Sequence, residues 1–231
     1  VEGEITQLGG ANILFGCYDS EDFANEPLCD LFTRGQTAAP NNVNMVFDQF
    51  VNIASQRNSG VDVNLNIRHD LGRLGRVSLT GDVTGQTTDD FQLLPTSVAT
   101  STNGEAGSPE WVGDFRFNWT TNSGFSLFYG VNVIGATSDV QDFLDRNGGD
   151  LCIDSVTRGR YCPDLTTPTT FYHNMSVTQE IADGRFEITA GVSNLFNTRP
   201  PRVSTLNGGQ ITTLGGVVAA SQYPFTGRRG F

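Results

Sequence analysis

Cysteine, histidine and carboxylate side chains are the groups in this chain that could do chemistry, and the cysteines have the most informative spacing. The four cysteines fall into two local pairs, Cys17 with Cys29 and Cys152 with Cys162. Neither pair has the two-residue gap of a Cys-x-x-Cys metal or redox site. We interpret both pairs as disulfides formed in an oxidising compartment such as the periplasm, each stabilising one loop by roughly 2–4 kcal/mol. Free thiols and a metal site are the alternatives.

The other reactive side chains form no recognisable site. His69 and His173 have no second metal ligand at a useful spacing, so we interpret them as satisfied polar residues. Asp19, Glu21 and Asp22 lack the spacing of a calcium-binding loop, and a solvated surface is the simpler interpretation. The sequence contains no Gly-x-Ser-x-Gly motif and no phosphate-binding glycine loop. We therefore predict no enzyme activity, no cofactor and no metal site.

Alternating apolar and polar residues predict that the chain is built mainly of β-strands. Successive side chains of a strand point to opposite faces, so this alternation gives each strand one apolar and one polar face. In the clearest example, the apolar residues Val61, Val63, Leu65 and Ile67 alternate with the polar residues Asp62, Asn64, Asn66 and Arg68. Strands are predicted over six segments, at 43–69, 76–87, 110–120, 125–136, 169–181 and 185–197. Gly60, inside the first segment, predicts a bulge or a close backbone approach.

The connections between the predicted strands are short and long in turn. Three are tight, at 70–76, 121–124 and 182–185, and Asn122-Ser123-Gly124 and Asp183-Gly184 are hairpin-turn sequences. The others are long and irregular, at 1–42, 88–109, 138–168 and 198–227. Compact soluble domains seldom carry several loops longer than about 15 residues. Tight turns at one end of a sheet and long loops at the other are typical of a transmembrane β-barrel.

Composition restricts the class of protein. The 231 residues are 37% apolar and 17% charged, with a net charge of −11 that argues against nucleic acid as a partner. No run of 18 or more apolar residues occurs, which excludes a transmembrane helix, whereas a strand crosses a bilayer with about 9–11 residues. Burying the polar strand faces in a dry core would cost several kcal/mol, so these faces suit solvent or a wet lumen. A soluble β-sandwich would instead bury Val63, Leu127 and Ile188 in a sealed centre.

Several sequence elements resemble TonB-dependent outer-membrane receptors. Residues 190–201, AGVSNLFNTRPP, resemble the penultimate-strand signature of that family. Residues 221–229, SQYPFTGRR, resemble the approach to its last strand, and residues 57–62, RNSGVD, resemble an element of a middle barrel strand. These three elements stand in family order and span most of the chain. Residues 17–20 and 31–34 also resemble a proteobacterial subgroup with large cysteine-bearing loops.

The resemblance implies an all-β fold, an antiparallel transmembrane β-barrel segment with about six strands of a barrel of about 22. Residues 1–231 would be the C-terminal part of the barrel, without the N-terminal plug, the TonB box, the earlier strands and the last strand. A bilayer cannot satisfy an open strand edge, so the missing strands are expected in a longer polypeptide or in other chains. The tight turns would face the periplasm of a Gram-negative bacterium, and the disulfide-bearing loops would face outward.

The resemblance also implies TonB-coupled uptake of a scarce solute, such as a siderophore, a cobalamin, a glycan or a peptide. The expected partners are outer-membrane lipid, the solute, and the TonB complex acting through a plug that this chain does not contain. Four loop aromatic residues are candidate ligand contacts, and each could equally pack its own loop: Phe143, Tyr161, Tyr223 and Phe225. A passive porin-like channel, a structural outer-membrane protein acting through its loops and a soluble secreted β-sandwich are the alternatives.

Overall fold

The computed structural model divides the chain into two compact units. Residues 1–59 and 88–101 form the first unit, and residues 60–87 and 102–231 form the second. The long strands β4 (Phe50–Asp70) and β5 (Arg76–Gln92) contribute residues to both. The structure describes residues 2–20, 22–35, 42–92, 99–155, 159–182, 184–204, 206–207, 210–211, 223 and 227–230.

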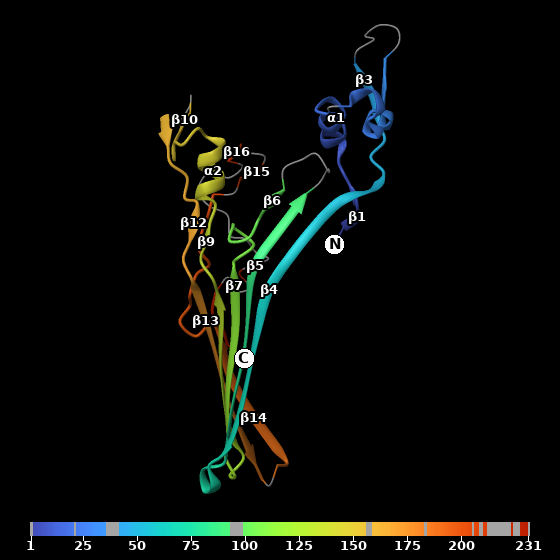
Figure 1. Cartoon of the computed structure of the whole chain (residues 1–231). Helices are drawn as coiled ribbons and strands as arrows, with labels where there is room; N and C mark the ends of the chain where they lie inside the picture. The colour runs from blue at the N-terminus through green and yellow to red at the C-terminus, as the bar shows by residue number, and fades with distance from the viewer. Residues whose placement is uncertain are drawn as a thin grey trace. The chain divides into compact units, whose positions relative to one another are not determined.

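The second unit contains a long antiparallel sheet, which confirms the antiparallel β architecture of the predicted fold class. Its main strands are hydrogen-bonded in the order β4-β5-β7-β8-β13-β14, and they run side by side in Figure 1. The four further strands are β7 (Trp111–Thr120), β8 (Phe125–Ile134), β13 (Thr170–Ile181) and β14 (Phe186–Ser193). The short β17 (Arg229–Gly230) pairs with the end of β14. Among the described residues, the sheet is not closed into a barrel.

Tight turns join the strands where the sequence predicts them. The amide of Thr121 donates to the carbonyl of Phe125 at 2.8 Å, and Gly124 has a φ of 79° that suits a glycine. The turn between β4 and β5 contains the 3-10 helix η3 (Gly72–Leu74). The third turn includes Asp183, which lies outside the described residues. Figure 1 shows the helix α2 (Val140–Arg146) at the opposite end of the strands from these turns.

The predicted strand over 43–69 is wrong as one continuous element. The structure contains β3 (Val43–Val46), which pairs with β2 (Phe32–Arg34), and then β4 from Phe50. Non-local hydrogen bonds occupy the residues between β3 and β4. The amide of Phe47 donates to the carbonyl of Leu31 at 2.7 Å, and the Asp48 carboxylate accepts from the amide of Gly9 at 3.0 Å.

Two other strand ends also differ from the prediction. β14 ends at Ser193 rather than at 197, because Asn194 adopts a φ of 54° and its side chain bonds the backbone N–H and C=O of Thr198. β5 continues past the predicted end at 87, and its last residues pair with β6 (Thr100–Ser101). The close approach expected at Gly60 is confirmed, since a Cβ there would lie 2.5 Å from the carbonyl oxygen of Gly85.

The first unit is a small helical and strand cluster in a segment that the sequence predicts to be irregular. Its strand β1 (Glu2–Gln7) pairs with the start of β4. Its helices are α1 (Gly10–Tyr18) and the 3-10 helices η1 (Phe23–Asn25) and η2 (Pro27–Leu31). The predicted Cys17–Cys29 disulfide is present and joins α1 to η2. Leu8, Ile13 and Leu28 are buried beside it.

Short elements also order the long connection between β8 and β13. Besides α2, they are β9 (Thr137–Ser138), β10 (Ile153–Ser155), β11 (Gly159–Tyr161) and β12 (Thr166–Thr167). Within this connection, two-stranded sheets are formed by β9 with β12 and by β10 with β11. A further two-stranded sheet lies after β14 and pairs β15 (Leu206–Asn207) with β16 (Gln210–Ile211). Neither α-helix in the described part of the chain is long and apolar enough to cross a bilayer.

Candidate functional site

The sheet of the second unit presents one apolar face that no other layer of the described residues covers. In the observed register, Phe117 lies opposite Tyr129, Tyr129 opposite Met175, and Met175 opposite Val192. None of these four side chains is buried. This face therefore carries a continuous row of apolar side chains across four strands, all at least partly exposed.

The three residues that would test a sealed core lie on this same face. Val63 is 57% exposed and Ile188 is 61% exposed, and Leu127 is also not buried. These side chains do not interleave in a sealed centre. The described residues thus lack the packed core that a β-sandwich would require.

Aromatic residues lie toward both ends of the apolar face. At the turn end, the Trp119 indole donates to the carbonyl of Leu74 at 2.8 Å and its ring meets Phe125 edge-on, with centroids 5.9 Å apart. Nearer the loop end, Nδ1 of His173 lies 2.7 Å from the hydroxyl of Tyr129, a residue in the middle of β8. The His173 ring contacts Phe196 edge-on at 4.9 Å. His173 is thus a hydrogen-bonded polar residue, and no group of three metal-ligating side chains occurs among the described residues.

The opposite face of the same strands carries a ladder of polar side chains. Arg116 forms an ion pair with Asp114, and the Asn132 amide donates to the Asp114 carboxylate. Nδ2 of Asn174 donates to Oδ1 of Asn132 at 3.0 Å, and the backbone amide of Asn194 donates to Oδ1 of Asn174 at 3.0 Å. The ladder crosses β7, β8 and β13 and ends at the turn after β14.

Solvent contact limits what this ladder adds to stability. The side chains of Arg116 and Asp114 are 56% and 25% exposed, so water screens their ion pair and its contribution is at most about 1 kcal/mol. Arg116 is exposed and Asp114, Asn132 and Asn174 stay partly exposed, whereas Asn194 at the end of the ladder is buried. The polar face is therefore suited to contact with an aqueous space. The alternation of apolar and polar residues in the sequence predicts that these residues share one face, but it does not predict which of them form hydrogen bonds with one another.

A buried aromatic cluster ties the loops to the sheet at the loop end. Tyr172 is fully buried and packs with Ile134 and Tyr223. The Tyr223 hydroxyl donates to Oγ1 of Thr167 at 3.2 Å, and Oγ1 of Thr167 lies 2.8 Å from Oγ1 of Thr137. Tyr223 is therefore held against the base of the connection between β8 and β13.

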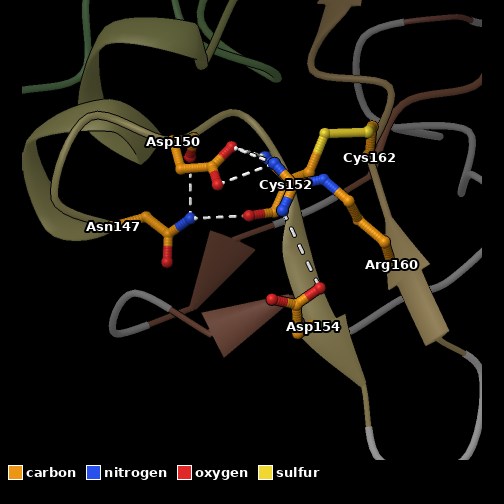
Figure 2. Close-up of a disulfide and its surroundings, with 6 residues drawn as sticks. All are labelled: Asn147, Asp150, Cys152, Asp154, Arg160 and Cys162. Carbon is orange, nitrogen blue, oxygen red and sulfur yellow. Dashed lines mark hydrogen bonds and ion pairs between the residues drawn. A yellow bond between two sulfur atoms is a disulfide. The ribbon is translucent and has the colours of Figure 1, made fainter.

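The predicted Cys152–Cys162 disulfide is present within a polar loop, shown in Figure 2. Arg160 donates to both carboxylate oxygens of Asp150, at 2.8 and 2.9 Å. Nδ2 of Asn147 donates to the carbonyl of Cys152 at 3.2 Å. Two hydrogen bonds lower the pKa of the Asp150 carboxyl below its usual value of 3.8. The bond from the Cys152 amide has the larger effect, and the bond from Arg160 has the smaller one. The disulfide and the ion pair fix the same short hairpin.

Asp139 links two of the long loops through a buried carboxylate. Only 6% of this residue is exposed, and its carboxylate accepts a hydrogen bond from the amide of Ala106 at 2.7 Å. Its own backbone amide donates to the carbonyl of Leu165 at 2.9 Å. Burial raises the pKa of the Asp139 carboxyl above 3.8, the bond from Ala106 opposes this shift, and the nearby Asp142 adds to it.

We expect the contact between these two loops to be pH-dependent. The folded pKa of Asp139 is raised, so its contribution to stability is complete below pH 3.8 and is lost as the pH rises through the folded pKa. Hydrogen exchange at the Ala106 amide, corrected for its intrinsic rate, should show greater protection at the acidic end of this window. Asp139→Asn should flatten the profile, and Asp145→Asn, a change at an exposed residue of α2, the helix that follows Asp139, should leave it intact. Identical profiles for wild type and Asp139→Asn would contradict the assignment.

The candidate ligand contacts lie in different surroundings. Phe143 and Tyr223 are each 2% exposed and pack within the loops. Tyr161 is half-buried, with its hydroxyl 3.5 Å from Oγ of Ser204. Phe225 lies outside the described residues. The observed packing gives Phe143 and Tyr223 a structural role, and ligand contact by any of the four stays a prediction.

The first unit contains a cavity that the sequence reasoning missed. It has a volume of about 630 Å³ and lies beside the Cys17–Cys29 disulfide. The Arg34 guanidinium, which lines it, lies 5.2 Å from the ring centroid of Tyr18 and 5.4 Å from that of Phe32. The cavity is lined by residues between 17 and 35 that meet only in the folded unit, so the pattern of the sequence does not predict it.

Comparison with known proteins gives one structural similarity. No protein-family model matches the sequence, and no curated protein shows significant similarity to it. The chain is similar to a crystal structure of the ferric enterobactin receptor (PfeA) of Pseudomonas aeruginosa, in a glycine-to-valine mutant form, with a TM-score of 0.48 and 14% identity. The similarity covers 85% of this chain and 24% of the receptor chain. It is a likeness in fold to a part of that receptor and carries no argument about function.

Proposed function

We propose that this chain is part of the wall of an outer-membrane receptor barrel, with its apolar face against lipid and its polar face toward a wet lumen. The observation that carries the proposal is the contrast between the two faces of one sheet. The apolar face, with Val63 and Ile188, is exposed, and the opposite face bears the hydrogen-bonded ladder from Arg116 to Asn194. Lipid on one side and water on the other satisfy both faces at once.

Strand length and loop placement support the same arrangement. β7 and β8 have 10 residues each and β13 has 12, close to the roughly 9–11 residues with which a tilted strand crosses a bilayer. The tight turns lie at one end of the sheet and the disulfide-bearing loop at the other, as in outer-membrane barrels. In the proposed orientation the loops face outward and the turns face the periplasm of a Gram-negative bacterium.

In this proposal, further strands join the sheet at the edge formed by β14. β17 pairs Gly230 with Val192 and Arg229 with Ser193, antiparallel to β14. A strand continuing in this register would run beside the rest of β14 toward Phe186. In this proposal the chain is the C-terminal part of a longer receptor, and further strands and a plug complete the barrel. The intact protein would then have a mass several times the 24.9 kDa of this chain.

The proposed activity is TonB-coupled uptake of a scarce solute, with the barrel as a rigid wall and the loops as the recognition surface. Siderophores, cobalamins, glycans and peptides are the solute classes to compare. The protein would have no enzymatic role. A passive porin-like channel would use the same sheet, with one apolar and one polar face, but would conduct solutes without an input of energy.

The decisive experiment measures uptake of labelled solutes from the four classes by wild-type cells, gene-deleted cells and complemented cells. We expect deletion to abolish high-affinity uptake of one class, and complementation to restore it only in cells with functional TonB. Uptake that is independent of TonB, together with steady ion conductance in planar bilayers, would favour the passive channel instead. Extraction of the protein without detergent would contradict the membrane placement itself.

A further inference from the structure

A polar cavity lies at the turn end of the sheet, in the second unit. It has a volume of about 500 Å³ and is formed by the β4–β5 turn together with the ends of β7 and its turn to β8. Arg68, Asp70, Arg76, Ser78, Asn118 and Asn122 line it. Residues 76 and 78 share the polar face with Asn118, because Ser78 lies opposite Asn118 in the register. The cavity therefore opens on the polar side of the sheet.

The charge of this cavity is opposite to that of the chain as a whole. The protein has a net charge of −11, yet the cavity is lined by two arginines and one aspartate. The pair between Arg76 and Asp70 is weak, with 4.0 Å between Nη2 and Oδ2 and with side chains 72% and 68% exposed. Among the described residues, the side chain of Arg68 has no ion pair or hydrogen bond. One guanidinium is thus uncompensated, and the second is held only loosely.

The cavity wall is fixed before any ligand arrives. The amide of Gly72 donates to the Asp70 carboxylate at 2.7 Å, and the Asn122 side chain donates to the carbonyl of Gly72 at 3.1 Å. Gly75 has a φ of 92°, and a Cβ there would lie 2.1 Å from the carbonyl oxygen of Thr120. Only glycine permits this approach, so the two turns pack directly together. A preorganised wall loses little conformational entropy when it binds a ligand.

We propose that this cavity is a binding site for a small anion that carries carboxylate or phosphate groups. Arg68 and Arg76 supply the charge, and guanidinium groups match the planar or tetrahedral oxygens of such anions with paired hydrogen bonds. Ser78 and Asn118 supply neutral hydrogen-bond donors on the same wall. The size of the cavity suits a small solute, and its position on the polar face favours an anion from the aqueous space over a lipid headgroup. The inference does not depend on energised transport.

The test titrates the intact native protein in detergent micelles with citrate and, separately, with inorganic phosphate, and follows the heat of binding. We expect saturable binding that weakens as ionic strength rises. The double change Arg68→Gln with Arg76→Gln should weaken citrate binding by about tenfold or more, because two charge-assisted contacts are lost. Arg73→Gln, on the same hairpin but outside the cavity lining, is the matched control and should leave the affinity unchanged.

A gain-of-binding variant keeps the test independent of folding defects. Asp70→Asn removes the competing carboxylate and keeps an oxygen for the Gly72 amide, so it should strengthen citrate binding by about threefold. Absence of saturable binding in the wild type would overturn the proposal, and so would equal affinity in wild type and the double arginine variant. Binding to anionic lipid vesicles without binding to free citrate or phosphate would also overturn it, since the source would then be a lipid surface.

Discussion

Replacing Val177 with arginine is expected to lower the free energy of unfolding by about 2–4 kcal/mol, the cost of a charged side chain on the lipid face near the middle of a strand. Val177 lies near the middle of β13, between Leu127 of β8 and Ala190 of β14 on the apolar face. Neither neighbour is charged, and in the proposed orientation the guanidinium would face hydrocarbon. Urea unfolding of the intact protein in lipid vesicles measures this loss.

The matched control is the adjacent residue on the opposite face. Ser176 lies opposite Phe128 and Gly191 on the polar face. Ser176→Arg should change the unfolding free energy by no more than about 0.5 kcal/mol, because a surface position in contact with water tolerates a charge. If Ser176→Arg proved the more damaging of the two changes, the polar face would be the packed side, and the membrane orientation would be wrong.

Truncating Tyr172 should loosen the loop end of the sheet. Tyr172 is fully buried, with 0% of its surface exposed to solvent, and it packs against Ile134 and Tyr223. Replacing a large buried aromatic side chain with alanine typically costs about 3–5 kcal/mol, as buried apolar contacts are lost and a cavity remains. We expect Tyr172→Ala to lower the thermal midpoint and to increase hydrogen exchange in residues 137–138 and 166–167, which lie beside the cluster.

Tyr172→Phe separates the role of the ring from that of the hydroxyl. The ring is retained, so the cluster with Tyr223 should persist and hydrogen exchange in the same residues should stay close to wild type. An equal loss of protection in both variants would assign the effect to the hydroxyl rather than to packing. Unchanged exchange in Tyr172→Ala would show that the aromatic cluster does not hold the loops.

The six long strands follow from the sequence because period-two alternation is a local signal. Residues 61–68 show both faces of a strand without reference to any partner, and the turn at Asn122-Ser123-Gly124 requires only local backbone conformations. The two disulfides could also be predicted from the sequence, because the two cysteines of each pair lie within one loop and no competing cysteine is near. Local signals of this kind need no knowledge of the fold.

Register and packing could be read only from the tertiary structure. The interruption between β3 and β4 depends on Leu31 and Gly9, which lie far from Phe47 and Asp48 in the sequence. The burial of Phe143 and Tyr223, and the ladder from Arg116 to Asn194, likewise depend on which residues become neighbours across strands and loops. A shift of one residue in register would turn each strand's side chains to the other face.

The cationic cavity at the turn end is the clearest case of this division. Alternation places Arg68 on a polar face, and the sequence shows Arg76 at the start of the next strand. Their position in one cavity depends on the direct packing of Gly75 against Thr120, a contact between two separate turns. The sequence by itself determined which strand faces are polar and where the tight turns lie, because both features depend only on residues that are close together in the chain. Only the tertiary structure decided which polar groups meet, because non-local hydrogen bonds and packing set those distances.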